Sequence, residues 1–176
     1  MLELMENLDF FSTIFSRRSI RKFTKEHVAA KQVNQILKSA MYAPSANNEQ
    51  PWHFIIIEER KKLKEIVKVH PHAKMLKDAP LAILICWDDK LLKTTGYFEQ
   101  DCAAATQNLL LAVHNLNLGA VWLGVHPRED RKTGLRKLFG IPENIHPFSL
   151  IAIGYPDEQK EHPQRFLEDR IHIEKW

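Results

Sequence analysis

The sequence predicts a mixed α+β fold in a single domain spanning residues 1–176. Segments with apolar residues at helical spacing alternate along the chain with short runs of β-branched and aromatic residues. Hydrophobic residues make up 44% of the chain and charged residues 27%, a balance that favours a globular core and argues against disorder. The length of 176 residues is close to that of one domain, and no repeat or low-complexity tract divides it.

Five segments are predicted to be helices, and three of them have apolar residues at helical spacing. The first begins at Asn7, which can serve as its N-cap, and continues to about Arg17. The second stops before Pro44, because the residue before a proline disfavours the helical conformation. The longest is apolar nearly all round, which predicts a buried central helix, and Gly119 suits its C-terminal cap. Gly140 ends the last one. The predicted helices are 7–17, 26–42, 59–70, 97–117 and 128–139.

Four short runs rich in β-branched and aromatic residues predict strands, at 52–57, 80–87, 120–123 and 148–153. The run at 80–87 is apolar on both faces, so we expect it in the centre of the sheet. The longest unbroken apolar stretch, Ala79 to Trp87, has nine residues, whereas a membrane helix needs about 20. We therefore expect no membrane-spanning segment.

The start of the chain and its two cysteines indicate a cytoplasmic protein. The first residues are acidic and lack the basic and apolar regions of a secretion signal. Cys86 and Cys102 form no CxxC pair, which excludes a self-contained zinc ribbon, iron–sulfur cluster or thioredoxin-type site. We expect both to be buried thiols in a reducing cytoplasm.

The stretch Arg17-Arg-Ser-Ile-Arg-Lys-Phe23 is the first candidate for a binding site. Its four cations within six residues repel one another. A bound phosphate would turn that repulsion into attraction, and Ser19 would add a hydroxyl donor. A solvated basic turn is the alternative. A nucleic-acid site that also uses the cations of residues 128–137 is a third interpretation, but the net charge of +3 and the lack of a stacking motif argue against it. We expect no nucleic-acid partner.

Two further motifs place small or amide residues beside strands. Ala43-Pro-Ser-Ala-Asn-Asn-Glu-Gln-Pro-Trp-His-Phe54 is a loop stiffened by prolines that can read the edges of a planar heterocycle, although such loops more often only connect a helix to a strand. In Gly119-Ala-Val-Trp-Leu-Gly124, the backbone amides of Leu123 and Gly124 can donate to a ligand. Neither a Walker loop nor a GxGxxG fingerprint is present.

Two other clusters raise the question of a metal. His70-Pro-His72 invites a site completed by one of three distant histidines, at positions 53, 126 and 146. H-x-H without a carboxylate pattern is, however, more often surface histidine. Asp88 and Asp89 follow a strand, where a solvated turn is more common than a cation site. We therefore expect no metal.

In this order, the three motifs closely resemble the FMN-dependent nitroreductase family. The likeness spans residues 11–176, including the alanine-rich helix before the third motif and the late stretch Arg165-Phe-Leu-Glu-Asp-Arg-Ile-His172. The resemblance implies a central mixed, mostly antiparallel sheet flanked by helices, in an intertwined homodimer that holds two FMN molecules at the subunit interface. The large apolar groups of residues 162–176 indicate a C-terminal arm that packs on the partner subunit.

The resemblance assigns the cofactor's phosphate to groups from both ends of the chain. Arg17 and Ser19 correspond to phosphate ligands, Arg18 lies beside them, and Arg165 corresponds to a late arginine that closes on the phosphate. A phosphate monoester carries between one and two negative charges at neutral pH, which suits this set.

The other cofactor-binding residues that the resemblance implies surround the flavin ring. Arg21 corresponds to a basic residue near N1 and the C2 carbonyl, and Lys74 occupies a place where some members have a lysine near the ring. This chain lacks the asparagine that some members place just upstream of that lysine. A loop that the other subunit lays on the ring contributes Pro44, Ser45 and Asn47. The backbone of Leu123 and Gly124 corresponds to the segment beside N5 and the C4 carbonyl.

The function that the resemblance implies is that of an FMN-dependent oxidoreductase. Hydride passes from NAD(P)H through flavin N5 to a small electron-poor acceptor, such as a nitroaromatic, a quinone or an activated alkene. Because N5 itself accepts and delivers the hydride, no catalytic side chain is predicted. The alternative is a family member with other flavin chemistry, namely dehalogenation, enone reduction or flavin fragmentation. The motifs do not name the acceptor, nor do they distinguish NADH from NADPH.

Overall fold

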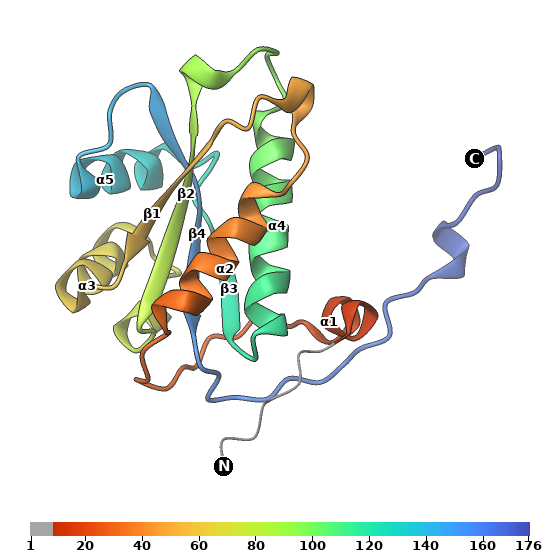
Figure 1. Ribbon diagram of the computed structural model, residues 1–176, viewed down its shortest axis with the longest axis horizontal. Helices are drawn as coiled ribbons and strands as arrows, with labels where there is room; N and C mark the ends of the chain where they lie inside the picture. Colours follow the sequence, from red (N-terminus) through yellow and green to blue (C-terminus); the bar gives the residue numbers. More distant parts are fainter. Residues whose placement is uncertain (1–8) are drawn as a thin grey trace.

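A four-stranded antiparallel sheet forms the centre of the computed structural model, which describes residues 9–176 (Figure 1). Its strands lie in the order β1-β2-β4-β3, and each neighbouring pair is antiparallel. One parallel element adjoins the sheet, an isolated bridge between Ser19 and Ala120. The predicted α+β fold and mostly antiparallel sheet are thus confirmed. The strands are β1 (Trp52–Ile57), β2 (Leu81–Asp88), β3 (Gly119–Gly124) and β4 (Ile145–Gly154).

The sheet separates two hydrophobic cores, each covered by a pair of helices (Figure 1). The long helix α4 and its neighbour α2 cover one face, and α3 and α5 cover the other. All of β2 is buried, as expected for a central strand. The helices are α1 (Phe10–Ser16), α2 (Ala30–Met41), α3 (Arg60–Val69), α4 (Phe98–Asn115) and α5 (Glu129–Phe139), and the short 3₁₀ turns are η1 (Ala46–Asn48), η2 (Lys74–Lys77), η3 (Asp89–Leu91) and η4 (Glu168–Arg170).

Two predicted helix starts differ from the structure. The N-cap of α1 is Asp9, whose carboxylate accepts the backbone N–H groups of the first turn, whereas Asn7 lies outside the described residues. Helix α2 begins at Ala30 and not near residue 26. The side chain of Gln32 accepts the Ala29 N–H at 3.1 Å, which fixes the start there, and Val28 just before it is buried in the core.

The predicted cap of α4 is also wrong. Asn117, with φ 59°, supplies the left-handed residue after the helix, and Gly119 instead opens β3. Gly119 is required for a different reason, because a Cβ at this position would lie 2.8 Å from the side chain of Ile20. The prediction that Gly140 ends α5 is confirmed, since it adopts φ 63° and ψ 37°.

Both ends of the described chain expose large apolar side chains. Phe11 and Phe15 of α1 are 64% and 69% exposed, and the C-terminal arm runs away from the sheet with Trp176 fully exposed (Figure 1). Exposed apolar groups of this size mark a surface that associates with another surface. Within residues 9–176, no helix combines the length and apolar character needed to cross a bilayer.

Candidate functional site

A cationic groove lies where the chain passes from α1 to α2. It has a volume of about 610 Å³ and brings together four of the predicted cofactor-binding residues. Arg17 lies beside it: burial lowers the pKa of its guanidinium, and the nearby Arg165 and Arg18 cations lower it further. Repulsion of this kind is relieved when an anion binds. The groove is lined by Arg18, Ser19, Arg21, Gln159, Lys160, Glu161, Pro163 and Arg165.

The segment carrying Arg17–Lys22 is fixed on both sides. Ile20 donates its N–H to the carbonyl of Ala120 at 2.9 Å, so the segment lies along β3. On the other side, the carboxylate of Glu158 accepts the N–H groups of Arg21 and Lys22 at 2.5 and 3.2 Å. These contacts place Ser19 next to the first residues of β3.

The arginines of the groove differ in what their guanidinium groups contact. That of Arg18 donates to the carbonyls of Glu161, Phe15 and Arg17 at 2.9, 2.8 and 2.7 Å. Arg18 therefore joins the end of α1 to the base of the C-terminal arm. In the described part of the chain, the guanidinium groups of Arg17 and Arg165 form no hydrogen bond or ion pair, so they are available for a ligand.

Gly124 lies at the other end of β3, about 13 Å from Ala120 at the usual rise of a strand. No heavy atom lies within 4 Å of the position that a Cβ would take at Gly124, so the space above it is open. Its carbonyl accepts two hydrogen bonds, from Nε2 of His70 at 3.0 Å and from Arg131 at 2.6 Å. Leu123 before it is buried. An oriented peptide with open space above it can receive a flat ligand.

Sequence reasoning missed the roles of His70 and Arg131. His70 is 1% exposed, and its Nδ1 accepts the N–H of His72 at 3.3 Å. Burial lowers the pKa of His70, so the ring is neutral and its Nε2–H is the donor to Gly124. No local pattern signals a contact between residues 54 positions apart. The structure thus makes His70 a support of β3 and not a surface histidine.

The loop of residues 44–50 is held in an irregular shape. Asn47, Asn48 and Gln50 have φ of 48°, 51° and 47°, and the hydroxyl of Ser45 accepts the Gln50 N–H at 3.0 Å. Pro44 and Asn47 remain exposed. The loop is therefore ordered, and its outer edge is available for contacts.

This loop and the cationic groove do not meet within one chain. Ala46 donates its N–H to Asp101, in the first turn of α4, at 2.9 Å. Ser16, next to the groove, contacts His114, in the last turn of α4, at 2.7 Å. Asp101 and His114 are 13 positions apart, which is about 20 Å along a helix. Lys74 also lies apart from the groove, exposed in η2 and four residues after His70.

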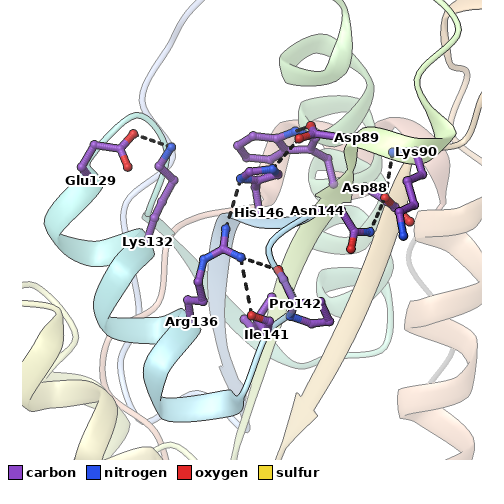
Figure 2. Close-up of polar contacts among 11 residues, drawn as sticks. Asp88, Asp89, Lys90, Glu129, Lys132, Arg136, Ile141, Pro142, Asn144 and His146 are labelled. Atoms are coloured by element: carbon purple, nitrogen blue, oxygen red, sulfur yellow. Dashed lines mark hydrogen bonds and ion pairs between the residues drawn. The ribbon is translucent and has the colours of Figure 1, made fainter.

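The acidic pair at the end of β2 belongs to a polar network at this end of the sheet (Figure 2). Asp88 accepts from the Lys90 N–H and the Asn144 side chain, both at 2.8 Å. Asp89 pairs with His146 at 2.6 Å, and Arg136 donates to the same ring. Residues 9–176 contain no group of three or more metal-ligating side chains arranged to hold a metal ion.

Comparison with known proteins identifies an oxidoreductase of α+β fold. The model of the nitroreductase family matches residues 14–74 and 67–155, and the chain therefore belongs to the nitroreductase family. A protein of Methanothermobacter thermautotrophicus, provisionally named NADH dehydrogenase/NAD(P)H nitroreductase, is 49% identical over 172 residues, which are 98% of this chain and 90% of the relative.

Solved structures and a more distant relative extend the comparison. A Clostridium acetobutylicum structure provisionally named an NADH oxidase has a TM-score of 0.90 and 42% identity, over 93% of this chain and 99% of its own. An FMN-dependent nitroreductase of Clostridium difficile has a TM-score of 0.88 and 27% identity, over 95% and 100%. An iodotyrosine deiodinase of Thermotoga neapolitana is 27% identical, over 82% of this chain and 87% of the relative.

Proposed function

We propose that this protein is an FMN-dependent oxidoreductase that passes hydride from NAD(P)H to a small electron-poor acceptor. The single observation that carries the proposal is the placement of a cationic groove and an open, oriented glycine peptide along one strand. Ser19 lies beside Ala120 at the start of β3, and Gly124 ends it. A ligand with a phosphate at one end and a flat ring at the other matches this arrangement.

The phosphate of FMN would bind to Arg17, Ser19 and Arg165. The two guanidinium groups are not engaged by the protein, and their mutual repulsion supports binding of an anion. Arg18 would act beside them by fixing the turn and the base of the arm, because its donors already hold three carbonyls.

The ring would lie over Leu123 and Gly124, with Arg21 as the cation for its N1 side and Lys74 as a further cation from η2. A bound FMN supplies hydride transfer at its N5 position, for which no acid or base side chain is required. The chain's own contribution is to hold the ring. His70 and Arg131 fix the peptide of Gly124, and Gly124 itself leaves the space above β3 open.

The complete site would require a homodimer. Because the loop with Pro44, Ser45 and Asn47 lies at the far end of α4 from the groove, its contact with the same flavin would come from a second chain. The exposed apolar residues of α1 and of the arm, 162–176, supply a surface for that second chain. The two free, buried cysteines suit the reducing cytoplasm that we propose as its location.

Purification followed by FMN titration tests the cofactor, and stopped-flow spectroscopy tests the reaction. We expect a yellow protein whose flavin is bleached by NADH, NADPH or both, and then reoxidised by a nitroaromatic, quinone or activated alkene. A chain that fails to bind added FMN would contradict the proposal. Sedimentation of the flavin-loaded protein should show a dimer.

Dehalogenation is a second candidate, favoured by the likeness to an iodotyrosine deiodinase. The same FMN site would serve it, so the acceptor panel should include a halogenated phenol. Release of halide at a rate above that of nitroaromatic reduction would make dehalogenation the better assignment.

A further inference from the structure

Two buried carboxyl groups hold the same turn of the 44–50 loop. Glu49 is 6% exposed and Asp101 is 4% exposed. One oxygen of Asp101 accepts the Ala46 N–H at 2.9 Å, and Glu49 donates its own N–H to the Ala46 carbonyl at 3.0 Å. Both residues therefore bind Ala46, Asp101 through its carboxylate and Glu49 through its backbone N–H, and they come from different elements.

Each carboxyl has one satisfied oxygen and one buried oxygen without a partner. Oε2 of Glu49 accepts the N–H groups of Lys93 and Thr94 at 2.7 and 3.2 Å. Oε1 of Glu49 and Oδ2 of Asp101 are buried and have no hydrogen-bond donor. Both residues bind Ala46, and besides burial the Glu49 carboxyl raises the pKa of Asp101, as expected for neighbouring acidic groups. If both were ionised, their charges would repel, and two acceptors would remain unsatisfied.

We propose that Glu49 and Asp101 share one proton, carried by Oδ2 of Asp101 and donated to Oε1 of Glu49, and that this bond positions the loop for contact with the flavin. A single proton satisfies both remaining oxygens. We place it on Asp101 because the Glu49 carboxyl already accepts two backbone N–H groups through Oε2, whereas the Asp101 carboxyl accepts one. The positioning role rests on the proposed function, whereas the shared proton does not.

The surroundings of the pair support this assignment. Burial raises the pKa of Asp101, and the Glu49 carboxyl raises it further, although the Ala46 N–H opposes the shift. Lys93 is the cation on the covering segment, and its ammonium donates to the Asn47 carbonyl at 3.3 Å. On α4, Glu99 pairs with His126. Among residues 9–176, no cation forms an ion pair with either carboxyl of the pair, which leaves a proton as the neutralising group.

Infrared spectroscopy of the purified holoprotein at pH 7 tests the shared proton directly. We expect a carboxylic-acid C=O band that both Asp101→Asn and Glu49→Gln abolish, because either amide removes the need for the proton. Asp130→Asn, which changes an exposed aspartate in the first turn of α5, should leave the band. A band that survives Glu49→Gln would show that Asp101 is protonated independently. Absence of the band from the wild-type protein would overturn the proposal. This result needs no variant, so it holds even if a variant fails to fold.

The positioning role is tested by FMN titration at rising pH. Loss of the shared proton leaves two buried negative charges under the loop, so wild-type affinity should fall about tenfold per pH unit above the pair's apparent pKa. Asp101→Asn, whose amide donates in place of the acid, should bind FMN within about twofold of wild type at pH 7 and remove this alkaline fall. An equal fall in affinity at alkaline pH in both proteins would refute the positioning role but not the shared proton. Absence of FMN binding would refute the proposed function, and the infrared test of the shared proton would still hold.

Discussion

The imidazole of His70 donates a hydrogen bond to the carbonyl of Gly124 at 3.0 Å, and so joins the end of α3 to the end of β3. Arg131, from α5, donates to the same carbonyl at 2.6 Å. Three elements thus fix one peptide at the edge of the sheet. A peptide held in this way does not need to reorient when a ligand binds beside it.

Two substitutions of His70 should distinguish the effect of its hydrogen bond to Gly124 from the effect of its packing volume. His70→Leu leaves the His72 N–H without its acceptor and removes one donor to Gly124, so we expect a loss of about 1–3 kcal/mol in the free energy of unfolding. His70→Gln can still donate to Gly124 and should recover part of both stability and FMN affinity. Urea denaturation and FMN titration measure the two effects. Equal losses in both variants would show that the ring packs there but does not position Gly124.

Stability should fall as the pH drops below about 6.5. Burial lowers the pKa of His70, His114 and His126 in the folded protein relative to 6.5, and at His114 the Arg17 cation adds to this effect. The unfolded chain therefore binds more protons in this range, and acid favours unfolding. The urea midpoint measured between pH 7.5 and 5.5 should decrease, and less so in His114→Gln. A midpoint that rises toward pH 5.5 would contradict the burial argument.

Arg17→Ala should weaken FMN binding by about 1.5–3 kcal/mol, roughly 10- to 100-fold, because a charge-assisted hydrogen bond is lost. The fall in affinity should be smaller at high salt, where the wild-type contact is itself weakened. Arg128→Ala, at an exposed arginine that pairs with Asp130, is the matched control and should leave the affinity unchanged. Unaltered flavin affinity in Arg17→Ala would refute the phosphate assignment.

Alanine at the two glycines that begin and end β3 should affect different properties of the protein. A Cβ at Gly119 would lie 2.8 Å from Ile20, so Gly119→Ala should destabilise the fold by about 1–3 kcal/mol. Gly124 has open space around its Cα, so Gly124→Ala should leave the stability of the flavin-free protein within about 0.5 kcal/mol and weaken FMN binding. Thermal denaturation with and without FMN distinguishes the two. Unchanged FMN affinity in Gly124→Ala would show that the flavin ring does not lie over this end of β3.

Mixing two variants that each weaken flavin binding should restore it in part if the site is shared between chains. The groove and the loop lie about 20 Å apart along α4, so an Arg17→Ala chain and an Asn47→Ala chain damage different halves of each site. A heterodimer of the two has one intact site, and we expect up to half of wild-type FMN binding after co-refolding. If the mixture contains heterodimer but FMN binding does not recover, the groove and the loop that contact one flavin would belong to the same chain.

The sequence predicted the elements and the type of site because both depend on local patterns. The apolar run of β2 and the periodicity of α4 follow from residues close together in the chain, and β2 is central as expected. The clustered arginines at residues 17–21 likewise indicated an anion site, and the groove that they line lies where Arg165 arrives from the other end of the chain. The predicted starts of α1 and α2 were wrong because side-chain capping fixes them. Several neighbouring polar residues could cap each helix equally well, and the sequence does not show that Asp9 and Gln32 do so.

Only the tertiary structure showed which distant polar groups lie together. His70 contacts Gly124 across 54 residues, and Glu49 meets Asp101 from another element, so neither pair leaves a trace in the local pattern. Whether a histidine is a surface group or a buried support is decided by desolvation and by its partners, which exist only after folding. By itself the sequence determined which segments are apolar and where charge gathers, because those are properties of neighbouring residues. The fold decided which of those groups touch.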